Sequence, residues 1–281
     1  MIIRFKIISI PKSLIGENIS KTTGGKTIHF PQYYFKSQYL KKTMSYYAFI
    51  PHRAPDEQNP IIFLLHGQGG HWYSFKDQAE QLMGLAEDNH IIIVTPDGTT
   101  DGWWIDSPLV PDNQVESYFI KELIPSVKMA LSTSAKIGVA GVSMGAYGAL
   151  LLPPKHRGIF SAAASMSAIT DIINGNTLNK WRFRELFGVL KKNRALWEAN
   201  SARQLFENNL DIAGELPLFI CCGNKDHMLK ENRALHEMLK ENKIEHEYME
   251  GNGGHLDYWL SPSNPSNPLS QVIEWMALKL R

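Results

Sequence analysis

One serine lies in a sequence context that favours nucleophilic catalysis. Ser143 is the centre of Gly141-Val142-Ser143-Met144-Gly145, a Gly-x-Ser-x-Gly pattern. An apolar run precedes the pattern and small, apolar residues follow it, so the serine falls at a sharp turn from a strand to a helix. Side chains in place of the two glycines would crowd such a turn. Turns without any chemistry can carry the same pattern, but the flanking strand and helix lead us to predict that Ser143 is a nucleophile.

A serine hydroxyl needs a general base, and the base needs an acid to orient it. For a serine on this type of turn, the acid and then the histidine follow along the chain. Asp226 opens the loop after the apolar run PLFICCG, and His255 lies in a glycine-rich loop after IEHEYMEG. We predict that these two residues complete a triad with Ser143. The weaker alternatives are His227, His246 and Asp257.

Backbone N–H groups beside the nucleophile would stabilise the oxyanion of an acyl transfer. Met144, the residue after the serine, is expected to supply one N–H. We expect the second from Gln68, in the loop HGQGG that follows another apolar run. Three glycines surround Gln68 and would let this loop approach the acyl carbon. We interpret His66 as a structural residue of the loop.

Aromatic and histidine side chains follow several predicted strands, at the sheet edge where α/β proteins bind their ligands. Together they favour a substrate with a short or aromatic acyl group, or a sugar ring, over one with a long fatty chain. For any single one of these side chains, a purely structural role in core or loop packing is an equal alternative. The predicted substrate-binding residues are His71, Trp72, Trp103, Trp104, Tyr258 and Trp259.

The elements that must position these residues are short apolar runs alternating with amphipathic stretches. Continuous apolar runs are typical of strands buried on both faces of a parallel sheet; they cover 60–67, 90–98, 136–143, 160–168 and 217–223. Apolar residues at helical spacing fill several of the intervals. We therefore predict a three-layer α/β fold, as a single domain over residues 1–281.

Two parts of the chain depart from this alternation. In the first fifty residues we predict a strand at the very start and another at Met44–His52, with a polar loop over Gly16–Gly25 between them. From Thr170 to Glu215 the sequence shows amphipathic pieces and no convincing strand. We predict a helical insertion at about 170–215. It would serve either as a lid or pocket wall or as extra packing on the sheet edge, and these two roles are equal alternatives.

Composition excludes several function classes. The chain has 281 residues and a formal net charge of +1, which gives no electrostatic case for nucleic acid or an anionic membrane. No apolar run approaches the ~20 residues that span a bilayer, and no signal peptide is evident. Cys221 and Cys222 are adjacent and indicate reduced core residues. We expect a cytoplasmic protein without metal or organic cofactor, and leave the oligomeric state open.

These motifs together resemble the α/β-hydrolase superfamily. Within it they are most similar to the esterase group of tributyrin, feruloyl and acetyl-xylan esterases, S-formylglutathione hydrolases and mycolyltransferases. The matching stretches, which span roughly residues 45–260, are LLHGQGG, IIIVTPDGTTDGWW, KELIPSV, GVSMGAYGAL, CCGNKD and GGHLDYW. Ala146 departs from a glycine usual in relatives. Val142 and Tyr147 stand where S-formylglutathione hydrolases typically have histidines, so the motif looks more like the tributyrin and feruloyl branch.

The resemblance implies an α/β-hydrolase fold and a serine carboxylesterase with the triad Ser143, Asp226 and His255. The expected substrates are short-chain acyl, acetyl or feruloyl esters, including carbohydrate-linked ones, hydrolysed through an acyl-enzyme. The alternatives are an acyltransferase with the same triad, a serine peptidase, and a non-catalytic binding module on a hydrolase scaffold.

Overall fold

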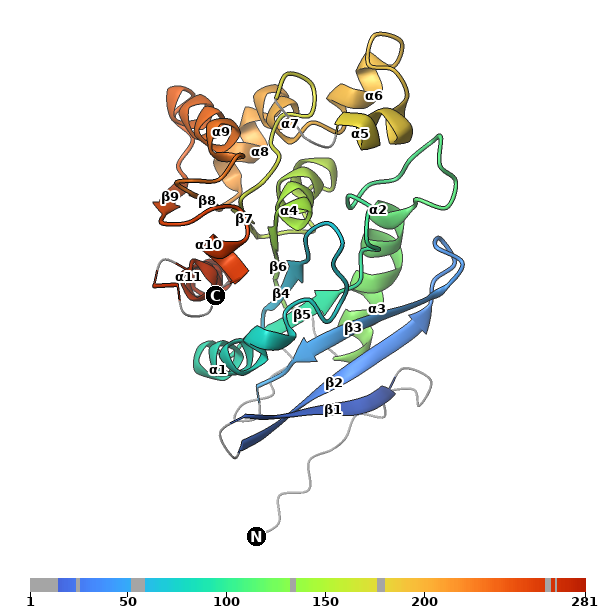
Figure 1. The fold of residues 1–281 in the computed structure, drawn as a ribbon, viewed down its shortest axis with the longest axis vertical. Coiled ribbons are helices and arrows are strands. Elements are labelled where there is room, and N and C mark those ends of the chain that lie inside the picture. Colours follow the sequence, from blue (N-terminus) through green and yellow to red (C-terminus); the bar gives the residue numbers. More distant parts are fainter. Residues whose placement is uncertain are drawn as a thin grey trace.

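The computed structural model describes residues 15–23, 26–51, 59–131, 135–175, 180–260, 264–265 and 267–281. In these ranges nine strands form one sheet, in the order β1-β2-β3-β5-β4-β6-β7-β8-β9 (Figure 1). The strands are β1 (Ile15–Thr23), β2 (Lys26–Lys36), β3 (Thr43–Phe49), β4 (Ile61–Leu65), β5 (Ile92–Pro96), β6 (Ile137–Val142), β7 (Ala162–Met166), β8 (Leu218–Gly223) and β9 (Glu247–Gly251).

The strands from β5 across to β9 are all parallel to one another. Each of the five apolar runs in the sequence contains one of the parallel strands β4 to β8, so the prediction of a largely parallel buried sheet is confirmed. The register between β4 and β6 places Leu65 opposite Gly141. The loops after these two strands therefore start side by side, and they carry Gln68 and Ser143.

Helices cover both faces of the sheet, which confirms the three-layer α/β fold. Helices α1 and α11 pack on one face, and α4, α9 and the continuous segment α2–α3 pack on the other (Figure 1). A π-helical turn, Phe119–Leu123, joins α2 to α3. The bounds are α1 (Ala79–Asn89), α2 (Val115–Tyr118), α3 (Ile124–Ala130), α4 (Met144–Lys155), α5 (Lys180–Phe187), α6 (Arg194–Glu198), α7 (Ala202–Asn208), α8 (Leu210–Glu215), α9 (Leu229–Glu241), α10 (Asp257–Leu260) and α11 (Leu269–Leu280).

The prediction of a loop over Gly16–Gly25 is wrong. Strand β1 covers most of that segment and pairs antiparallel with β2, from Thr23 opposite Lys26 back to Ile15 opposite Tyr33. Pairing of strands uses backbone groups, so a polar sequence can still form a strand when a neighbour is available. The strand expected at the start of the chain lies outside the described residues.

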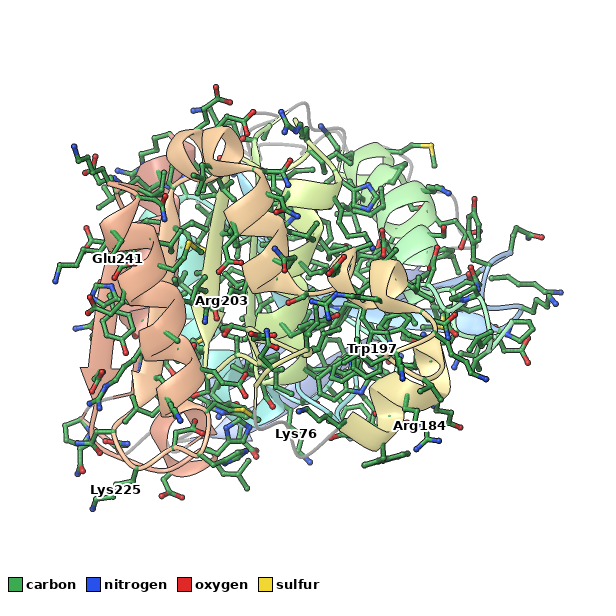
Figure 2. The ribbon with its side chains drawn as sticks, turned by 90° about the horizontal axis from the view of Figure 1, so that it is seen from above. Lys76, Arg184, Trp197, Arg203, Lys225 and Glu241 are labelled. Atoms are coloured by element: carbon green, nitrogen blue, oxygen red, sulfur yellow. The ribbon has the colours of Figure 1, made fainter. Side chains whose placement is uncertain are left out.

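The interval between β7 and β8 contains the four helices α5 to α8 and, among its described residues, no strand. Most of its aromatic side chains are buried, although Trp181 is exposed. Phe183 is fully buried, and its ring centroid lies 4.7 Å from that of Trp103. Figure 2 shows Arg184 and Trp197, from α5 and α6, on the opposite side of the molecule from Glu241 of α9. Whether this insertion also acts as a lid stays a prediction.

Two further observations concern the helices and the cysteines. None of the described helices is both long and apolar enough to cross a bilayer. Cys221 and Cys222 are both buried in strand β8, as the sequence predicted, and neither forms a disulfide within the described part of the chain.

Candidate active site

Ser143 occupies the turn between β6 and α4 in a strained backbone conformation. Its φ is 54° and its ψ is −114°, outside the regions that L-residues favour. A Cβ on Gly141 would overlap the backbone of Gly145, and a Cβ on Gly145 would overlap the carbonyl of Leu65. Both glycines are therefore required for the turn that raises the Ser143 hydroxyl above the sheet.

The structure brings Ser143, His255 and Asp226 into one chain of hydrogen bonds. The Nε2 atom of His255 lies 2.8 Å from Ser143 Oγ. The Nδ1 atom of the same ring lies 2.9 Å from Asp226 Oδ2 and 3.1 Å from Oδ1. Along the chain, His255 is 112 positions from Ser143 and 29 from Asp226, so only the fold unites the three loops that carry them. With a proton on Nδ1, the histidine is oriented to accept the serine proton at Nε2.

The carboxyl group of Asp226 is fully buried yet kept ionised. Burial alone would raise its pKa, but hydrogen bonds from His255 and from the Met228 backbone N–H, which is 2.8 Å from Oδ1, outweigh burial and lower the pKa below its usual 3.8. A carboxylate in this place stabilises the imidazolium that forms when His255 takes the serine proton.

His66 holds the loop that carries Gln68, and its hydrogen bonds go to backbone groups rather than to the triad. Its Nδ1–H donates to the Gly67 carbonyl at 2.8 Å, and its Nε2 accepts the Gly98 N–H at 2.9 Å. Burial lowers the pKa of His66 to about 4, so the ring stays neutral near pH 7. This agrees with the interpretation of His66 as a structural residue.

Two backbone N–H groups are available beside Ser143. A Cβ on Gly67 would lie 3.4 Å from the Cβ of Ser143, which shows how closely the loop approaches the serine. In that loop the Gly69 N–H donates to the Thr100 carbonyl, 2.6 Å away. Within the described part of the chain, the backbone N–H groups of Gln68 and Met144 have no acceptor. These are the two N–H groups that the sequence predicted for an oxyanion hole.

A partly buried ion pair between Asp101 and Arg182 supports the loop that carries Gln68, and we did not predict this pair from the sequence. Asp101 accepts a hydrogen bond from the side-chain amide of Gln68 at 2.8 Å and one from Trp103 Nε1 at 2.8 Å. Its other oxygen lies 2.9 Å from Nε of Arg182, in α5 of the insertion. No local signal marks Asp101 or Arg182, since they are 81 positions apart and meet only in the fold.

Ser143 and His255 lie in a cleft of about 380 Å³. Its remaining lining consists of the glycine-rich loop and a mainly apolar wall, namely Gly67, Gln68, Gly69, Gly70, Ser74, Phe75, Val142, Leu256 and Trp259. Trp259 was predicted from the sequence. Phe75 and Leu256 were not, although both closely follow loops that carry predicted site residues.

The prediction that Trp103 and Trp104 bind substrate is wrong, because both side chains are completely buried. Each has a positive φ, 54° and 56°, and their rings pack among core side chains of the sheet face that carries α4. A Cβ on Gly148 of α4 would lie 2.7 Å from Cγ of Trp104. The small residues after the nucleophile thus make room for Trp104, and both tryptophans pack against helix α4.

The other predicted aromatic positions have mixed outcomes. His71 and Trp72 lie in the loop between Gly70 and Ser74 but are absent from the residues that line the cleft. His71 stacks on Tyr73 with ring centroids 5.1 Å apart. The side chain of Tyr258 lies outside the described residues.

Comparisons with known proteins agree with this geometry. A family model described as "Putative esterase" matches residues 37–260. An acetyl esterase of Caldicellulosiruptor saccharolyticus is 26% identical over 270 residues, which are 86% of this chain and 96% of that protein. Among solved structures, an S-formylglutathione hydrolase of Agrobacterium tumefaciens superposes with a TM-score of 0.77 at 20% identity, covering 95% of this chain and 100% of the other. A ferulic acid esterase gives 0.73 at 20% identity, covering 94% and 100%.

The fold and the family match together define a serine ester hydrolase of the α/β-hydrolase type. The chain belongs to the esterase family whose model it matches over most of its length. These relatives support a serine carboxylesterase and do not favour the acyltransferase or binding-module alternatives.

Proposed function

We propose that the protein hydrolyses short-chain or aromatic carboxylic esters through an acyl-enzyme on Ser143. The observation that carries the proposal is the unbroken hydrogen-bond chain from Ser143 Oγ through His255 to the buried Asp226. Ser143 and His255 line a cleft, so an ester carbonyl can reach the Ser143 hydroxyl.

In the first half of the proposed cycle, Ser143 Oγ attacks the ester carbonyl carbon while Nε2 of His255 takes its proton. The backbone N–H groups of Gln68 and Met144 donate to the resulting oxyanion. His255 then gives the proton to the leaving alcohol, and the acyl group stays on the serine. In the second half, water repeats the sequence, loses its proton to His255 and releases the carboxylic acid.

The size and lining of the cleft support a small acyl group. Its volume of about 380 Å³ lies near the lower end of ligand sites, roughly 300–1,000 Å³. Phe75 and Trp259 supply aromatic surface, and Val142 and Leu256 supply aliphatic surface. Such a wall suits an acetyl, butyryl or phenolic acyl group. An acetyl esterase and a ferulic acid esterase stand among the relatives, in agreement with this range.

An ester panel tests the proposal. It would contain p-nitrophenyl acetate, butyrate and octanoate, methyl ferulate and an acetylated xylo-oligosaccharide, each assayed with wild type and Ser143→Ala. We expect kcat/KM for at least one short or feruloyl ester to exceed that for octanoate by about tenfold or more. Loss of the serine should lower kcat by about 10⁶-fold, to background. Preferred hydrolysis of octanoate, or an active Ser143→Ala protein, would overturn the proposal.

A further inference from the structure

His227 lies between the triad and helix α9 and has no part in the mechanism above. Its Nδ1 is 3.5 Å from Asp226 Oδ1, and its ring centroid is 4.6 Å from that of His255. The side chain is 44% exposed, whereas that of Asp226 is fully buried. Two imidazoles therefore flank one buried carboxylate, and one of the two is free to adjust its position.

This arrangement matches the ligand set of a zinc-type cation. One ligand atom from each of Asp226, His227 and His255 lies within 4.8 Å of the others. Bonds of about 2.1 Å in a tetrahedral site place neighbouring ligand atoms about 3.4 Å apart. The distances from Asp226 Oδ1 to His255 Nδ1, 3.1 Å, and to His227 Nδ1, 3.5 Å, are close to that separation. Only the two imidazoles need to approach each other, and rotation of the exposed ring supplies that movement.

A second cavity exposes one of these ligands, His227, to solvent. His227 lines a space of about 280 Å³ that shares no lining residue with the substrate cleft. Arg203 of α7, labelled in Figure 2, and Asp171 line the same space. An ion could therefore reach His227 while the substrate cleft is occupied.

We propose that Asp226, His227 and His255 form a binding site for a zinc-type divalent cation, and that an ion bound there blocks hydrolysis. The inhibitory half of this inference rests on the proposed function, because it takes the triad as the target. From the sequence we expected no metal, and the sequence did not indicate that the catalytic pair could supply two ligands.

Inhibition follows from the two tautomers of one ring. An ion on Nδ1 of His255 requires the lone pair there, so the ring proton moves to Nε2. Nε2 then donates to Ser143 Oγ in place of accepting from it, and the serine cannot lose its proton. The ion also replaces the hydrogen bond between His255 and Asp226. No covalent bond between heavy atoms breaks, and removal of the ion restores the original tautomer.

Direct binding tests the site without any dependence on activity. Zn²⁺ would be titrated calorimetrically into Ser143→Ala and into the double variant Ser143→Ala/His227→Gln. We expect the second substitution to weaken binding at least about tenfold. The matched control is His236→Gln in the same background, because His236 also contacts a second imidazole, that of His246 at 2.7 Å. Equal affinity with and without His227, or loss of binding only in the His236 variant, would overturn the proposal.

Inhibition is measured separately, as the Zn²⁺ concentration that halves ester hydrolysis relative to each variant's own metal-free rate. His227→Gln should raise this concentration at least about tenfold, a chelator should restore the wild-type rate, and Mg²⁺ should have no effect. Binding without inhibition would refute the inhibitory half. A protein that binds Zn²⁺ through His227 but hydrolyses no ester would refute the proposed function and leave the metal site standing, so the two failures are distinguishable.

Discussion

Replacing Asp226 with asparagine would separate the charge of the triad acid from its shape. The side chain is fully buried and contacts His255 Nδ1 at 2.9 Å and the Met228 N–H at 2.8 Å. Asparagine has nearly the same volume and can still accept from Met228. Its amide group would, however, present a donor to Nδ1, which favours the ring tautomer with the proton on Nε2. His255 would then donate to Ser143 and could not take its proton.

The expected loss is large because the wrong tautomer removes the general base. In serine proteases the corresponding change lowers kcat by about 10⁴-fold. We expect a similar fall here, which corresponds to about 5.4 kcal/mol of transition-state stabilisation. The assay is p-nitrophenyl acetate hydrolysis at saturating substrate, with KM expected to change little because no lining residue of the cleft is altered. A fall in kcat of less than about tenfold would refute the assigned role of Asp226.

The same variant has a second readout in acid stability. The folded pKa of Asp226 lies below its unfolded value, so the carboxylate stabilises the folded protein above about pH 4 and this contribution is lost as pH falls through the folded pKa. An asparagine at this position cannot titrate, so the Tm of Asp226→Asn should fall less between about pH 5 and pH 3 than that of wild type. An unchanged slope would show that His255 and Met228 do not stabilise the anion.

Two further substitutions test the packing and the loop around the site. Gly148→Ala should lower the free energy of unfolding by about 1–3 kcal/mol because Trp104 has no room to move. The control is Gly84→Ala in α1, which has open space around it and should leave that free energy unchanged or raise it by up to about 1 kcal/mol. Urea unfolding compares the two variants, and equal effects would contradict the packing argument. Asp101→Ala should lower kcat/KM about tenfold, because it releases the loop that carries Gln68, the predicted oxyanion donor. The control is Asp211→Ala, which removes an exposed carboxylate and should change kcat/KM less than about twofold. Equal kcat/KM values for the two variants would show that the ion pair of Asp101 with Arg182 has no influence on the site.

The sequence predicted the central sheet and the triad because both depend on local patterns. Strands β4 to β8 are buried on both faces, so each reads as a continuous apolar run. Ser143, Asp226 and His255 each lie in a loop after a strand, and they follow one another in the order that is usual for a nucleophile on this type of strand-to-helix turn. Their hydrogen bonds are therefore a consequence of parallel strands that end at one edge of the sheet.

Other features could not be predicted because they depend on partners far along the chain. Strand β1 is polar and exists through its pairing with β2. Trp103 and Trp104 follow a strand, as cleft residues do, but positive φ values turn their rings into the core. The pair of Asp101 and Arg182 joins the loop after β5 to an inserted helix, and no local pattern reports a contact of that kind.

The most direct test of the account is the position at which the protein becomes acylated or phosphonylated. A fluorophosphonate probe reacts with a serine only when a base activates it. After labelling, peptide mass spectrometry should place a single adduct on Ser143, and ester hydrolysis should fall in proportion to labelling. The Asp226→Asn protein should react far more slowly. An adduct on another serine that accompanies the loss of activity, or a folded wild-type protein that does not react, would contradict the central claim.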